Sequence, residues 1–201
     1  MKTHIKHLVS IASVTVLLAG CASAPSHFYT LNSTAKADGS PEAQYAVAVG
    51  PVSIPAEVDR PQLTVQSGQN RVEIEEFNRW AAPLRENIAR AVAGDLAILL
   101  GTPRVTGVPL ANFNPDYRVT IDIQQFESVR DQTTGNATAV IEAIWVVRPT
   151  KEGAARSGRT VARESATGDS FEALAAAHSR ALAKVSSAIA AAIRAEAEEK
   201  P

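Results

Sequence analysis

Residues 169–193 read DSFEALAAAHSRALAKVSSAIAAAI, and this stretch decides the fold because it is the longest regular pattern in the chain. Large side chains recur along it at a mean spacing of about 3.6 residues, which predicts one long amphipathic helix. That stripe consists of Phe171, Leu174, His178, Leu182, Val185, Ile189 and Ile193. Asp169 and Glu172 have the spacing of a capping box at the helix start. The opposite face is mostly alanine, which is either exposed or packed closely against another element.

A second amphipathic helix is predicted between Pro83 and Gly101. Pro83 fits the first helical turn, and Gly101 followed by Pro103 ends the helix. Its apolar stripe recurs every three or four residues: Leu84, Ile88, Val92, Leu96 and Leu99. The chain therefore contains two long helices, each with one apolar face.

Several short stretches have the alternation or β-branched content of strands. They are residues 27–31, 45–54, 63–66, 71–77, 117–123, 138–147 and 159–165. Pro51 and Pro55 suit residues 45–54 to an edge or terminating strand. Leu63 and Val65 before residues 67–70, with Val72 and Ile74 after them, predict a hairpin with a four-residue loop.

Two later strands carry further detail. Phe126 breaks the alternation of residues 117–123, which indicates a bulge or a strand end. Residues 138–147 are apolar on both faces apart from Glu142, which predicts a strand covered on both sides. No repeat and no linker divides the chain. We expect a mixed α/β (α+β) fold: a single domain with a mixed, mainly antiparallel sheet and two long amphipathic helices.

The first residues have the order of a secretory signal. A basic head with Lys2 and Lys6 precedes an apolar run over residues 8–18. The run is about a dozen residues long, short of the ~20 that a permanent transmembrane helix needs. Small residues then lead to Cys21, the one cysteine of the 201 residues.

The sequence Leu18-Ala19-Gly20-Cys21 resembles the lipobox of bacterial lipoproteins. The resemblance implies cleavage between Gly20 and Cys21, a diacylglycerol on the thiol and an acyl chain such as palmitate on the new amino terminus. We expect a signal peptide over residues 1–20, a lipidated cysteine and tether over residues 21–26, and a folded domain over residues 27–201. Ala22, rather than Asp, after the cysteine favours the outer membrane, facing the periplasm. The alternative is an ordinary signal peptide whose cleavage site contains a cysteine.

Composition excludes several classes of function. Lys2 and Lys6 would leave with the signal, which lowers Lys+Arg from 20 to 18 against 21 Asp+Glu. Such a surface lacks the basic footprint of a nucleic-acid-binding protein. The mature chain keeps His27 and His178, without metal-ligand spacing, so we expect no metal site. No Gly-x-Ser-x-Gly, phosphate loop or dinucleotide fingerprint occurs, so we expect no catalytic residues, no enzyme activity and no cofactor beyond the acyl chains on Cys21.

Three stretches together carry a resemblance to a known family. Phe28-Tyr29-Thr30-Leu31 follows the lipobox, Arg60-Pro61-Gln62-Leu63 comes next, and Trp80-Ala81-Ala82-Pro83-Leu84 opens the first helix. In this order they resemble the PqiC/YmbA family, the auxiliary lipoproteins of ABC-type and MCE-type transport systems. The likeness runs through essentially all of the mature chain, so residues 27–201 are expected to form the domain of that family.

The resemblance implies a role in lipid transport between membranes and in envelope integrity. The lipoprotein would meet a periplasmic MCE-domain protein and its inner-membrane components at the outer membrane, either as one copy or as a homo-oligomer. Alternatives are a lipoprotein that carries acyl chains in a groove between helix and sheet, an envelope enzyme, and a structural lipoprotein of another envelope machine.

Arg60, Gln62 and Trp80 are the candidate partner-binding residues. Arg60, beside Pro61, either binds a partner or sits on a solvated turn. Trp80 is either an exposed hot spot or, as we favour, a ring packed over the helix start. Phe28 and Tyr29 either pin the tether to the domain or dip toward the membrane.

Overall fold

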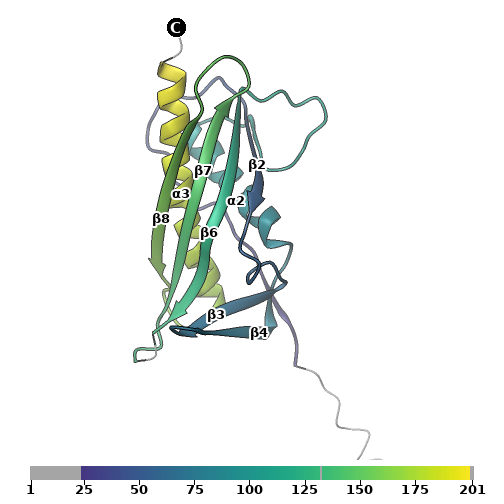
Figure 1. The fold of residues 1–201 in the computed structure, drawn as a ribbon, viewed down its shortest axis with the longest axis vertical. Helices are drawn as coiled ribbons and strands as arrows, with labels where there is room; N and C mark the ends of the chain where they lie inside the picture. The colour runs from purple at the N-terminus through teal and green to yellow at the C-terminus, as the bar shows by residue number, and fades with distance from the viewer. Residues whose placement is uncertain (1–23, 132, 200–201) are drawn as a thin grey trace, which may run out of the picture.

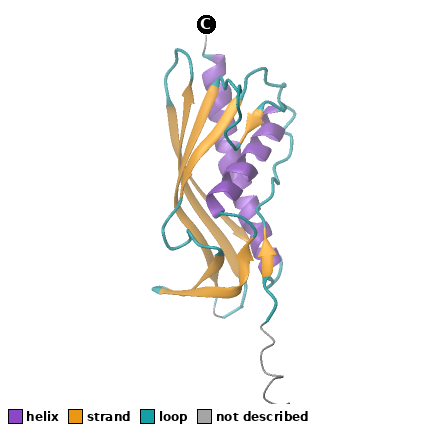
Figure 2. Ribbon diagram, turned by 90° about the vertical axis from the view of Figure 1, so that its right-hand side faces the viewer, coloured by secondary structure: helices purple, strands orange, loops and turns teal. Residues whose placement is uncertain are grey.

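The computed structural model describes residues 24–131 and 133–199. Within them the chain forms one mixed sheet of eight strands and two helices. Both helices lie on the same face of the sheet (Figures 1 and 2). The predicted α+β class, with one mixed sheet and two long helices in a single domain, is confirmed. In chain order the elements are β1 (His27–Tyr29), β2 (Val47–Ser53), β3 (Gln62–Gly68), β4 (Arg71–Trp80), α2 (Leu84–Leu100), β5 (Val105–Thr106), β6 (Tyr117–Arg130), β7 (Ala137–Pro149), β8 (Arg156–Ser165) and α3 (Phe171–Glu198).

Strand β6 is the centre of the sheet. One of its edges pairs antiparallel with β7, which pairs antiparallel with β8. The other edge is divided: β2 pairs in parallel with the first half of β6, and β3 meets it in parallel where Gln66 lies opposite Val129. β3 and β4 form an antiparallel hairpin, and the short strands β1 and β5 join β4 and β2 in parallel. The predicted mainly antiparallel arrangement therefore describes the long strands, whereas parallel pairings are the more numerous.

The two helices bury their predicted stripes. The buried side of α3 is wider than the predicted stripe, because four alanines beside that stripe are also buried: Ala175, Ala177, Ala181 and Ala190. On the opposite face Ala176 and Ala191 are exposed, so that face is not closely packed along its length. The capping-box prediction is one residue early, because Ser170 is the N-cap of α3 and its Oγ accepts from the Ala173 N–H at 3.1 Å. α2 ends as predicted at Gly101, whose φ of 64° suits glycine.

Three strand predictions need correction. β2 is not an edge strand, since it lies between β5 and β6, and Pro51 is accommodated by a register shift between Val49 and Val52. The hairpin loop is two residues long rather than four, because β3 continues to Gly68. β7 is not covered on both faces: the helices pack on one face only, and Ile144 on the other face is 40% exposed. The bulge predicted near Phe126 is confirmed by the register shift after Ile123.

The segment between β1 and β2, residues 30–46, crosses the helical layer, and we call it the strap. Asp95 of α2, which is fully buried, holds it: one carboxylate oxygen accepts hydrogen bonds from the Ser33 hydroxyl and from the Thr34 and Ala35 N–H groups, at 2.8–2.9 Å. The other oxygen lies 3.0 Å from the hydroxyl of Ser186 in α3. One carboxylate thus joins the strap to both helices.

Candidate functional site

Two of the three predicted partner-binding residues line one surface pocket. Arg60 and Trp80 meet there because the antiparallel hairpin returns the end of β4 to the start of β3. The pocket has a volume of about 310 Å³, and we call it the Arg60 pocket; its other lining residues are Asp59, Pro61, Ala82, Pro83 and Leu84. Gln62 is half-buried on β3 opposite Arg79 and does not line the pocket.

Backbone hydrogen bonds hold the walls of the Arg60 pocket in place. The Trp80 N–H donates to the Pro61 carbonyl at 2.7 Å, and the Ala81 N–H donates to the Tyr29 carbonyl at 2.8 Å. The N–H of Arg60 donates to the Val58 carbonyl, also at 2.8 Å. The pocket is therefore built on strand ends that are paired to each other, which gives it a defined shape.

The chemistry of the Arg60 pocket suits recognition of an acidic group with an apolar neighbour. Most of its lining is proline, alanine, leucine and tryptophan. The Nε atom of Arg60 is buried and has no hydrogen-bond partner. A buried guanidinium N–H without an acceptor is costly. A carboxylate or phosphate oxygen in the pocket could form a charge-assisted hydrogen bond with the guanidinium group of Arg60. Asp59, also in the lining, is paired with Arg85.

Trp80 supports the pocket from the core side. It is 6% exposed, and its ring meets Phe126 and His178 edge-on, at centroid distances of 6.0 and 6.3 Å. This burial supports the interpretation that the Trp80 ring is packed rather than exposed. Trp145 also lies in the core, and its Nε1–H donates to Thr160 at 3.0 Å.

His178 is a core histidine that is only half satisfied. Its Nε2 lies 2.9 Å from the Ser128 hydroxyl, its ring stacks on Phe126 at 4.2 Å, and its Nδ1 has no partner. Burial lowers the pKa of His178 to about 3, so the imidazole is neutral at physiological pH. With no acid on Nδ1 to orient it, this buried serine–histidine pair lacks the third member of a catalytic triad.

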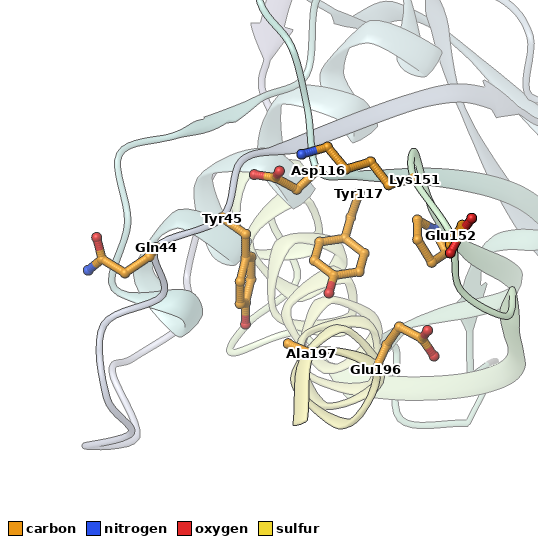
Figure 3. A pocket seen from close by; sticks show the side chains of 9 residues that line it. Gln44, Tyr45, Asp116, Tyr117, Lys151, Glu152, Glu196 and Ala197 are labelled. Carbon is orange, nitrogen blue, oxygen red and sulfur yellow. The ribbon is translucent and has the colours of Figure 1, made fainter. Parts of the chain in front are cut away.

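A second pocket, of about 280 Å³, lies at the other end of the domain, where α3 ends (Figure 3). Tyr45 and Tyr117 stand over Glu196 and Ala197, with their rings edge to face at a centroid distance of 5.2 Å. Burial raises the pKa of both phenols, so they stay protonated. Sequence reasoning missed this pair because the tyrosines are far apart in the chain, and only the parallel pairing of β2 with β6 brings them together.

The predicted lipidation and cleavage residues, Cys21 and Gly20, lie outside the described residues, as does the signal peptide. Within residues 24–131 and 133–199, no cluster of His, Cys, Asp or Glu has the make-up of a metal site. No helix in the same ranges has the length and hydropathy to span a membrane.

Comparison with known proteins identifies the family. The sequence model of the family described as "ABC-type transport auxiliary lipoprotein component" matches residues 29–190. Protein XCC0632 from Xanthomonas campestris has a similar structure, with a TM-score of 0.71, 17% identity, and coverage of 87% of this chain and 98% of that one. An uncharacterized protein has a TM-score of 0.66 at 18% identity, covering 85% and 99%. At these identities the two structures establish a shared fold.

No curated protein matches the chain. The family match covers most of the folded domain, including β4, which lines the Arg60 pocket, and most of α3. The chain therefore belongs to the family of ABC-type transport auxiliary lipoprotein components.

Proposed function

We propose that this protein is an outer-membrane-anchored periplasmic lipoprotein that docks the conduit of an MCE/ABC-type intermembrane lipid transport system at the outer membrane. Cys21 carries the acyl chains, and the domain binds the MCE-domain protein of the same system. The role is one of binding rather than catalysis, and it needs no metal or other cofactor.

The Arg60 pocket is the observation that carries this proposal. In a transport auxiliary component, a rigid pocket with apolar walls and an unsatisfied guanidinium Nε suits an acidic side chain of a protein partner. Membrane anchoring raises the effective concentration of the pocket for a partner that reaches the same leaflet.

The acyl-carrier alternative receives less support. Large side chains fill the interface between helices and sheet. Among them are Leu96, Ile121, Ile141, Leu182 and Ile189, and each of these is 0% exposed. The pockets described above open at the margins of that interface. A carrier would need these side chains to separate, so docking is the function we retain.

Replacing Arg60 by glutamate should weaken capture of the MCE-domain protein at least about tenfold, because two carboxylates would then face each other. Pull-down with purified partner measures the effect, and circular dichroism checks that the domain stays folded. Arg148→Glu, an exposed change on β7, is the matched control and should leave capture intact. Equal capture by the Arg60 variant and wild type would assign Arg60 to a solvated turn.

Replacing Cys21 by serine should abolish lipidation and release the protein from the outer-membrane fraction, because the thiol that takes the diacylglycerol is gone. Mass spectrometry of the intact protein and membrane fractionation measure the two effects. Normal outer-membrane fractionation of this variant would contradict the anchor.

A further inference from the structure

Four large apolar side chains are exposed on two neighbouring strands. Phe28 of β1 is 63% exposed, and Val72, Ile74 and Phe77 of β4 are 55%, 50% and 40% exposed. We call them the β1–β4 patch, since β1 pairs with the last residues of β4. The other exposed large apolar residues of the described ranges are spread over α2, β7, β8 and the loop after β5: Ile98, Val108, Leu110, Ile144 and Val161.

The β1–β4 patch lies at the end of the domain where the chain enters. Figures 1 and 2 show the β3–β4 hairpin across the lower end of the molecule, beside the start of the described chain. Five residues lie between Cys21 and His27, the first residue of β1. At no more than ~3.5 Å per residue, the acylated cysteine stays within about 20 Å of this strand.

The sequence left open whether Phe28 and Tyr29 pin the tether to the domain or dip toward the membrane, and in the structure the two residues differ. The Tyr29 hydroxyl donates to Asn78 Oδ1 at 2.9 Å, and its ring packs near Phe171, so Tyr29 pins β1 to the domain. Successive strand residues point to opposite faces, so Phe28 points away from these contacts into solvent. The rigid pairing of β1 with β4 thus presents Phe28 on a fixed support.

The charges around the patch are largely neutralised in place. Arg71 pairs with Glu73 and Arg79 pairs with Glu76, both at 3.0 Å. Glu75 lies 3.4 Å from the Asn78 amide nitrogen, which can donate to it. Since no cationic excess remains on β4, contact with a membrane would depend on the apolar side chains rather than on anionic lipids.

We propose that the β1–β4 patch rests on the phospholipid leaflet that holds the acyl chains of Cys21, with Phe28 and the apolar residues of β4 inserted at the headgroup boundary. The contact fixes the orientation of the domain on the membrane, and the proposal rests on the lipid anchor of the proposed function. If a second protein copy or another partner covered this surface instead, doxyl lipid would not quench a label in the patch more than a label at the control position.

The test uses the full-length lipidated protein in phosphatidylethanolamine vesicles that contain doxyl-labelled lipid. Because Cys21 is acylated, an introduced cysteine is the single free thiol for a bimane label. The positions are Ile74→Cys and Phe77→Cys in the patch, and Val161→Cys on β8, which is 45% exposed, as the matched control. We expect doxyl lipid to quench bimane at least twofold more at 74 and 77 than at 161, with no loss in high salt.

A second variant separates the patch from the anchor. Phe28→Ser in the Ile74→Cys background should lower the quenching at position 74 at least twofold, while the protein still floats with the vesicles. Equal quenching at all three positions, with normal flotation, overturns the patch alone. Failure to float overturns the lipid anchor and the patch together.

Discussion

Replacing Asp95 by alanine should lower the free energy of unfolding by about 3–4 kcal/mol, because the change removes one buried carboxylate and orphans its donors. Hydrogen bonds to a charged group contribute about 1.5–3 kcal/mol each, and they are not additive here because the freed strap can bind water instead. The ion pairs of the described residues do not include Asp95, so its charge is held by these hydrogen bonds. Urea unfolding measures the loss.

Hydrogen exchange gives the Asp95 prediction a second readout. The amides of Thr34 and Ala35 should exchange faster in Asp95→Ala, since both donate to the carboxylate in the wild type. Glu86→Gln, an exposed change on the same helix, is the control and should cost less than about 1 kcal/mol. Unchanged protection of the two strap amides would contradict the role assigned to Asp95.

The domain should lose stability steadily as the pH falls from about 6.5 to about 3, through His178. The pKa of the buried imidazole is about 3 in the folded state, against 6.5 for an ordinary histidine. In this window the unfolded chain binds a proton that the folded chain does not, so acid favours unfolding. Each pH unit costs about 1.4 kcal/mol, and the whole window costs on the order of 5 kcal/mol.

Matched variants isolate the His178 contribution. Folding also lowers the pKa of three carboxylates: Asp38, Asp131 and Glu164. Their protonation in acid also lowers the stability of the domain, but it does so equally in every variant. His178→Gln should therefore be less stable than wild type at neutral pH yet show a shallower slope between pH 6.5 and 3. His27→Gln, at an exposed position, should keep the wild-type slope. Equal slopes for His178→Gln and wild type would contradict a neutral buried imidazole.

Local patterns in the sequence were sufficient for the helices and for the hairpin. The 3.6-residue spacing and the Pro83 and Gly101 signals placed α2 to within a residue of its ends. The hairpin prediction implied that the start of β3 and the end of β4 meet, which is how Arg60 and Trp80 come to share a pocket. The N-cap was misplaced because Asp169 and Ser170 are both good caps, and their backbone angles decide between them.

Long-range parallel pairing left no local signal. Nothing near β2 or β3 indicates that they share one edge of β6, so the Tyr45–Tyr117 pair could not be foreseen. Asp95, in contrast, did leave a signal: it stands three residues after Val92 and four before Leu99, on the apolar stripe of α2. A charged residue at such a position must be satisfied inside the fold.

The register of the hairpin explains why its apolar residues are exposed. Val72 and Ile74 lie opposite Gln66 and Thr64, whereas Leu63 and Val65 face Glu75 and Glu73. The buried apolar residues therefore belong to β3, and those of β4 remain at the surface. Alternation alone predicts that one face of each strand is apolar. It does not predict which strand has its apolar face buried in the core.

The parallel pairing of β1 with β4 also has a mechanical consequence. A pull on the amino terminus acts along the axis of β1, so its pairs with β4 are loaded in shear and must break together rather than one after another. Beyond them, the strap transfers the remaining force to the helices at Asp95 before it can reach β2. A pull on the amino terminus is thus resisted first by β1 and the strap, before it acts on the central strands.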